Sequence, residues 1–141
     1  MTQQEELLHL YTDNAPYMTD YQLSIVSAEP GRVRLSAPVR KEICNNFGIV
    51  HGGVLMSIAD TAAGLAVFTR EQSYVTQNSS FQFLRSARKG KIFAESTVLH
   101  RGKTIAAVRV ELTDEDGCLL AEGLFSMFAV NTPFEPISPD R

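Results

Sequence analysis

The pattern of apolar and polar positions along the chain centres on residues 45–68. This segment opens with polar residues and glycines as far as Gly53, and continues as an apolar stretch whose one charged residue is Asp60. A helix formed here would carry small and branched apolar residues on every side: Val54, Leu55, Ile58, Ala59, Ala62, Ala63, Leu65, Ala66 and Val67. Because a helix that is apolar all round is normally buried, we expect a long central helix inside the protein.

Asp60 conflicts with this burial. An unpaired carboxylate inside a protein is costly, so Asp60 must be paired, protonated or beside a wet pocket. A core aspartate bonded to nearby backbone is one alternative, since structural networks also shelter carboxylates. A functional carboxylate is the other, and the residues just upstream of the helix favour it.

Strands are predicted on both sides of this helix. Before it, residues 21–28 and 32–38 are extended segments joined by a Pro-Gly turn. After it, four more strands are predicted at residues 75–84, 92–99, 104–112 and 118–130, with residues 100–103 as the tight turn between two of them. The first half of segment 75–84 is polar on both faces, which indicates a strand that lines a polar region or an interface.

The N-terminal residues 3–12 predict a short helix, which ends before Pro16. The element order is then helix, two strands, long helix and four strands. One long apolar helix and about six antiparallel strands predict an α+β fold, in which the sheet wraps around the helix. We expect a single domain over residues 1–141, with an N-terminal helix and linker at 1–20 and a flexible tail at 131–141.

Charge and composition narrow the possible partners. The net charge of −3 leaves no basic surplus, so nucleic acid is not expected as the main partner. The apolar run from Gly48 to Thr69 is interrupted by glycines, a histidine and an aspartate, so we expect no membrane span. The chain starts without a basic, then apolar, leader, and its two cysteines form no disulfide or metal pattern. These features predict a cytoplasmic protein.

Three groups of residues together resemble a known family. The first is Asn45-x-x-Gly48-x-x-His51-Gly52-Gly53, which is followed by Ala59-Asp60-Thr61. The others are the motifs that begin at Arg101-Gly102-Lys103 and at Glu111-x-Thr113-Asp114. In order and spacing the chain resembles the hotdog fold, and within it the phenylacetate-degradation (PaaI-type) acyl-CoA thioesterases, from about residue 29 to about residue 128. The resemblance implies hydrolysis of an acyl-CoA, with aromatic or medium-chain acyl groups among the candidates, and neither a cofactor nor a metal.

Thioester hydrolysis requires hydrogen-bond donors for the carbonyl oxygen, and a base or nucleophile near the carbonyl carbon. Gly52 and Gly53 stand where the central helix begins, so their unpaired amides are candidates for the oxyanion hole. Close packing of helix against sheet is the alternative reading of these glycines. Asp60 is the candidate base or nucleophile.

The distance between Asp60 and the two glycines implies that each site is formed by two chains. Asp60 follows the glycines by seven or eight residues, which is roughly 10–12 Å along a helix. A catalytic group must come within about 3 Å of its target, so Asp60 and the glycines of one chain cannot act on one carbonyl. We therefore expect Asp60 of one subunit to meet Gly52 and Gly53 of another, across antiparallel helices related by a two-fold axis. The resemblance implies the same arrangement, a homodimer at least, with homotetramers common.

The resemblance also suggests supporting residues. Asn45 matches a position that helps to polarise the carbonyl, although a loop-capping asparagine is an equal alternative. His51 matches a histidine beside the oxyanion glycine, and we favour a structural role in the loop. Thr76 falls where related enzymes place a hydroxyl near the attacking water. The alternative is that Thr76 is simply a β-branched residue of a strand, with no role in catalysis.

Substrate binding calls for cations and apolar side chains. The phosphates of CoA need a basic patch, for which Arg101 and Lys103 beside Gly102 are the first candidates among the charged residues of the second half. Solvated turn charges are the simpler explanation for any one of them. Phe83 is a candidate for the acyl pocket, and core packing explains it equally well.

Rival functions remain at this stage. An acyl-thioester dehydratase or hydratase would need a catalytic histidine in motifs that this sequence lacks. A non-catalytic acyl-CoA-binding module would bind CoA without turnover, and a purely structural oligomer would bind nothing.

Overall fold

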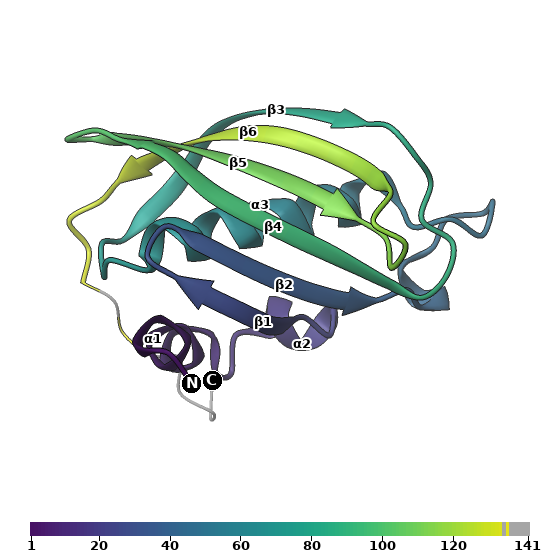
Figure 1. The fold of residues 1–141 in the computed structure, drawn as a ribbon, viewed down its shortest axis with the longest axis horizontal. Helices are drawn as coiled ribbons and strands as arrows, with labels where there is room; N and C mark the ends of the chain where they lie inside the picture. Colours follow the sequence, from purple (N-terminus) through teal and green to yellow (C-terminus); the bar gives the residue numbers. More distant parts are fainter. Residues whose placement is uncertain (134, 136–141) are drawn as a thin grey trace.

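The computed structural model describes residues 1–133 and 135 (Figure 1). Its helices are α1 (Gln3–Thr12), α2 (Pro16–Asp20) and α3 (Gly52–Phe68), with a short 3-10 helix at Lys41–Ile43. Its strands are β1 (Ser24–Glu29), β2 (Arg32–Pro38), β3 (Tyr74–Phe83), β4 (Lys91–Arg101), β5 (Ile105–Thr113) and β6 (Leu119–Ala129). The predicted order of helix, two strands, long helix and four strands is confirmed, and the described residues add two short helices, α2 and the 3-10 helix.

The six strands form a single antiparallel sheet in the order β1-β2-β4-β5-β6-β3. Strands β4, β5 and β6 follow one another as hairpins, whereas β3 and β1 occupy the two edges. Helix α3 lies along one face of the curved sheet and contacts β2, β3, β4, β5 and β6 (Figure 1). This is the predicted α+β arrangement of a sheet wrapped around one helix.

The core lies between α3 and the inner face of the sheet. Strand β5 illustrates the period of two: Ala106, Val108, Val110 and Leu112 are fully buried, and the residues between them are not. Ser96 of β4 joins the layers, because its buried hydroxyl lies within hydrogen-bond distance of the carbonyl oxygens of Val33 in β2 and Ala62 in α3.

Helix α3 is not buried on every side, which corrects the expectation from its apolar sequence. The sheet of one chain covers only one side of the helix, where Leu55, Ile58 and Ala62 are buried. On the other side Gly53 is exposed, and Asp60 and Gly64 are half-buried. The small residues of this side therefore form an open face, which one chain leaves uncovered.

Several boundaries differ from the predicted ones. Pro16 was expected only to end the first helix, but it also begins α2, because proline suits the first position of a helix. This extra turn delays β1 to Ser24. Strand β4 continues through Arg101, so the predicted four-residue turn is shorter than expected. The predicted flexible tail, residues 131–141, falls partly outside the described residues.

None of the described helices has the length and hydropathy needed to cross a lipid bilayer.

Candidate active site

Asp60 and Thr76 meet at the open face of α3. The Thr76 hydroxyl, on edge strand β3, donates a hydrogen bond of 2.5 Å to Oδ1 of Asp60 and lies 3.7 Å from the sulfur of Met127. The pairing of β3 with β6 shifts register between Thr76 and Asn78. Such a bulge bends a strand and redirects its side chains, and bulges are common beside active sites. The structure therefore brings together a carboxylate and a hydroxyl that lie on different elements.

The N-terminus of α3 holds the second group of predicted residues. His51 is the N-cap, and its ring nitrogen Nδ1 accepts a 2.9 Å hydrogen bond from the amide of Gly53. This corrects the expectation of two available amides, because the Gly53 N–H is already bonded within the loop. In the part of the chain that the structure describes, the Gly52 N–H has no hydrogen-bond partner. His51 thus stabilises the helix start, and Gly52 is the donor left for a ligand.

Asn45 closes the loop that leads into this helix. Its side-chain oxygen accepts hydrogen bonds from the amides of Phe47 (2.9 Å) and Ile49 (3.4 Å), as in the loop-capping alternative. Both of these bonds use Oδ1, so the side-chain NH2 remains able to donate to a ligand. Asn45 therefore shapes the loop and still presents a donor beside Gly52.

Asn45, Gly52 and Phe83 line one pocket of about 340 Å³, together with Arg85. The Phe83 ring lies against the helix start: a Cβ added to Gly52 would come 3.3 Å from its Cε1 atom. Glycine at position 52 thus allows both the close approach of this ring and access to the amide. Arg85 is one of the basic residues of the second half of the chain, and it is the basic residue that lines this pocket.

Asp60 lines a different pocket, of about 350 Å³, which we call the tyrosine pocket. Its wall opposite α3 is formed by Tyr11, Tyr17 and Tyr21 from the N-terminal segment. Burial, and secondarily the nearby Tyr11, raise the pKa of Tyr17 to about 12. The sequence analysis did not identify these tyrosines, because no motif links them to α3.

Arg101 has a structural role that the sequence did not indicate. Its guanidinium donates hydrogen bonds to the Tyr74 hydroxyl (3.0 Å) and to the carbonyl of Val67 (3.2 Å) in the last turn of α3. This arrangement satisfies a helix-terminal carbonyl with a cation, as the helix dipole favours. Arg101 was predicted to bind phosphate; in the structure two of its N–H groups donate within the chain, at the opposite end of α3 from Gly52.

Gly102 and Lys103 follow in the adjoining turn. The Gly102 amide donates to the carbonyl of Ile105, and a Cβ at this glycine would lie 2.9 Å from that oxygen. Gly102 is therefore required by the turn itself. Lys103 is exposed, so of these three residues it is the one whose side chain extends into solvent.

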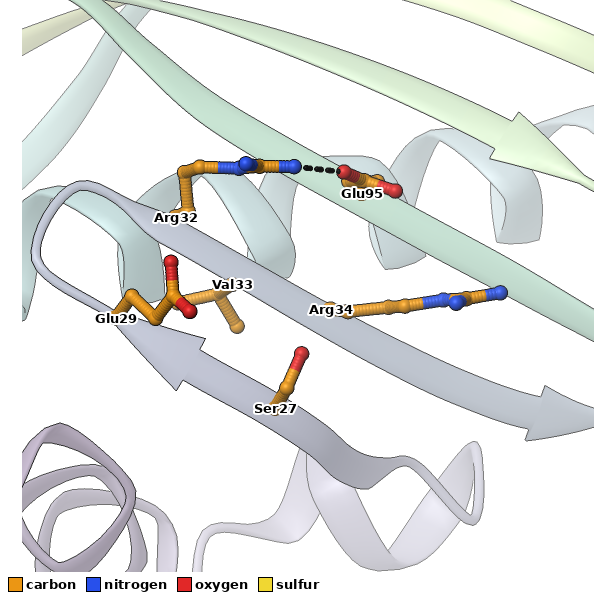
Figure 2. A pocket seen from close by; sticks show the side chains of 6 residues that line it. All are labelled: Ser27, Glu29, Arg32, Val33, Arg34 and Glu95. Atoms are coloured by element: carbon orange, nitrogen blue, oxygen red, sulfur yellow. Dashed lines mark hydrogen bonds and ion pairs between the residues drawn. The ribbon is translucent and has the colours of Figure 1, made fainter. Parts of the chain in front are cut away.

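A further depression lies on the outer face of the sheet and is lined by Ser27, Glu29, Arg32, Val33, Arg34 and Glu95 (Figure 2). Its charges compensate one another, because Arg32 donates a 2.6 Å hydrogen bond to Glu95 and both side chains are exposed. Helix α3 lies behind this face (Figure 2), and neither Asp60 nor Gly52 is among the residues that line the depression.

No three His, Cys, Asp or Glu side chains group as ligands for a metal ion within residues 1–133 and 135.

Comparison with known proteins places this geometry in a family. Residues 47–121, which include the helix start, Asp60 and Thr76, match the thioesterase superfamily. The chain belongs to the thioesterase superfamily. Its predicted class, a thioester hydrolase, is thereby confirmed. A Saccharolobus solfataricus protein named as an esterase is 33% identical over 112 residues, covering 78% of this chain and 80% of that protein. Human acyl-coenzyme A thioesterase 13 is 31% identical over 106 residues, covering 72% and 76%.

Solved structures share the architecture. The PaaI protein of the Escherichia coli phenylacetic acid degradation operon superposes with a TM-score of 0.90 over 94% of this chain and 96% of that one, at 22% identity. A Streptococcus mutans protein bound to acetyl-CoA gives a TM-score of 0.76 at 27% identity, covering 79% of this chain and 91% of that one. The predicted hotdog fold is confirmed by these superpositions.

Proposed function

We propose that the protein hydrolyses an acyl-CoA thioester to the free acid and CoA, at a site to which two chains contribute. The observation that carries this proposal is the separation of the two groups along α3. Asp60 with Thr76 forms one group, Gly52 with Asn45 forms the other, and eight residues of helix correspond to about 12 Å. One thioester carbonyl is too small to contact both groups within one chain.

The chemistry follows from the residue types. Asp60 accepts a proton from a water molecule that attacks the carbonyl carbon, or attacks this carbon itself to form an anhydride that water then opens. The Gly52 amide of the partner chain, at the positive end of its helix, stabilises the negative charge on the carbonyl oxygen. The Asn45 side-chain amide adds a second donor. The carbon–sulfur bond then breaks, and the CoA thiolate takes up a proton.

The edge strand β3 supports the pairing of two chains. It is ten residues long and is hydrogen-bonded to β6 on one side, and no strand among the described residues adjoins its other side. An exposed edge of this length is a template for pairing with another chain. Antiparallel pairing of two β3 edges around a two-fold axis would set the open faces of the two α3 helices side by side, with two sites per dimer.

The outer face of the sheet supports a further contact between dimers. Val75, Phe128 and Ile105 are cross-strand neighbours on β3, β6 and β5, and 51%, 39% and 43% of their surfaces are exposed. A row of exposed apolar side chains on the outer face suits a second interface. We therefore propose a homodimer as the catalytic unit and a homotetramer as its assembled form.

Acyl-CoA is the substrate class that the relatives support. Human acyl-coenzyme A thioesterase 13 carries this activity in its name, and the Streptococcus mutans structure contains acetyl-CoA. In this chain Arg85 lies in the same pocket as Gly52 and Phe83, and Lys103 is exposed. We assign the CoA phosphates to these two cations in place of Arg101.

The experiment that tests this function is a thiol-release assay over short, long and aromatic acyl-CoAs. The wild-type protein is expected to turn over at least one of them, and Asp60→Asn to lower kcat by at least about 100-fold, as for loss of a general base. The same proteins are titrated with CoA to separate binding from turnover. Saturable CoA binding by a wild-type protein that releases no thiol would contradict hydrolysis and indicate a binding module.

A further inference from the structure

We propose that the tyrosine pocket receives the acyl group of the substrate, that this acyl group is uncharged, and that Gly64 limits its length. The inference rests on the proposed function, because it takes Asp60 to act on the thioester carbonyl. It goes beyond that function by assigning the N-terminal segment and one glycine of α3 to substrate selection.

The position of the pocket follows from α3. Asp60 and Gly64 are one helical turn apart on the same face, about 6 Å along the axis, and both line the pocket. A thioester carbonyl that is in contact with Asp60 must therefore extend one of its two arms beside Gly64 or towards the three tyrosines. Asp60, the proposed reacting carboxylate, is therefore part of the wall of this pocket.

Size decides which arm enters. The volume of about 350 Å³ is at the lower end for small-molecule pockets. The CoA arm carries a nucleotide, three phosphates and a long pantetheine chain, and cannot be contained in such a space. An acyl group with one ring or a medium chain fits, so the acyl arm is the one that this pocket can hold.

The residues that line the pocket determine which charge on the acyl group it can accept. Tyrosine rings and Leu65 give apolar contact surface, and Asp60 contributes a carboxylate. None of the described residues that line the pocket is Lys, Arg or His. A second carboxylate on the acyl group would find no cation among the residues of this chain that line the pocket, and would be repelled by Asp60. The pocket therefore suits acyl groups of monocarboxylic acids.

Gly64 sets the depth of the pocket. A Cβ built on Gly64 meets no atom within 4 Å, so the space beside this glycine is open. Within one chain, a larger side chain at position 64 would point into that space without displacing other atoms. Alanine also favours the helix more than glycine does, so Gly64→Ala is expected to fold at least as stably as the wild type.

The test compares wild type, Gly64→Ala and Gly64→Leu on acetyl-, butyryl-, hexanoyl- and octanoyl-CoA. We expect the ratio of kcat/KM for octanoyl-CoA to that for acetyl-CoA to fall at least about 10-fold in Gly64→Ala, and further in Gly64→Leu. The ratio is measured within one preparation, so a fraction of unfolded protein does not alter it. The acetyl thioester serves as the internal control.

A second comparison tests charge at constant chain length. Butyryl- and succinyl-CoA both carry four-carbon acyl groups, and the wild type is expected to prefer butyryl-CoA by at least about 10-fold in kcat/KM. An active enzyme whose ratios are unchanged by both Gly64 substitutions, or one that prefers succinyl-CoA, would overturn the pocket assignment and leave hydrolysis intact. A wild-type protein inactive on all of these thioesters would refute the proposed function, and this inference with it.

Discussion

The Thr76 hydroxyl donates a 2.5 Å hydrogen bond to Oδ1 of Asp60, from a residue 16 positions further along the chain. The two residues lie on different elements, α3 and β3, and the bond joins them where the helix is open. It orients one carboxylate oxygen and leaves Oδ2 for water or a carbonyl carbon. The pair thus has the arrangement of a base held in place by a second group.

Removing this hydroxyl is expected to impair turnover more than folding. Thr76→Val keeps the shape of the side chain but removes the hydroxyl that orients the Asp60 carboxylate. We therefore expect kcat to fall about 10- to 100-fold, with the melting temperature changed little because the bond is exposed. Thr76→Ser keeps the hydroxyl and is the matched control, expected within about 3-fold of wild type. Equal losses in both variants would argue that strand packing matters, and that the hydroxyl does not.

The Gly52 amide can be deleted with little change to the backbone. Proline is favoured at the first helical position, and His51 has φ −59° and ψ 133°, a conformation that a following proline allows. Gly52→Pro removes the N–H, whereas Gly52→Ala adds a Cβ against Phe83 and keeps it. We expect kcat of Gly52→Pro to be at least about 100-fold below that of Gly52→Ala, the usual loss for one oxyanion donor. Similar rates in the two variants would exclude the amide from catalysis.

Arg101 is expected to matter for stability more than for CoA binding. Arg101→Ala leaves the Val67 carbonyl without its donor, so the free energy of unfolding should fall by about 1–3 kcal/mol. Lys103→Ala, at an exposed neighbour, should change it by less than about 0.5 kcal/mol. Urea denaturation measures both. A large rise in KM for acyl-CoA in Arg101→Ala, with unchanged stability, would instead restore the phosphate-binding role.

Tyr17 predicts a dependence of stability on alkaline pH. Its pKa is raised from 10.0 to about 12 in the folded chain, first by burial and then by Tyr11. At pH values between these two, the unfolded tyrosine has lost its proton while the folded one retains it. The free energy of unfolding must therefore fall as pH rises through this range. Denaturation between about pH 9 and about pH 11 should show a shallower decline in Tyr17→Phe than in wild type. Parallel curves for the two proteins would contradict a raised pKa at Tyr17.

The sequence was sufficient for the fold because its strongest patterns are also those that make the core. The apolar run after Gly53 has one charge and predicts α3, and alternation in segments such as residues 105–113 predicts the strands. The predicted ends of helices and strands were wrong where tertiary contacts determine them. Pro16 begins a helix that the pattern had marked only as an end, and β4 continues through Arg101, where the side chain caps α3.

The candidate site was only partly predictable. The positions of Asp60 and Gly52 could be inferred from helix geometry, since the rise per residue fixes their separation. The bond between His51 and Gly53, which removes one of the two expected donors, depends on a side-chain rotamer that spacing does not reveal. The tyrosine pocket depends on how the N-terminal segment packs against α3, and such contacts between distant segments leave no local pattern.

The central claim is that each site combines Asp60 of one chain with Gly52 of another. It is tested most directly by co-expressing Asp60→Asn and Gly52→Pro chains with different affinity tags and purifying through both tags. Each mixed pair then contains one site with Asp60 and Gly52 both intact, so thiol release should rise at least about 10-fold above either parent. Mixed oligomers no more active than the sum of the two parents, beside an active wild-type control carrying both tags, would contradict the shared site.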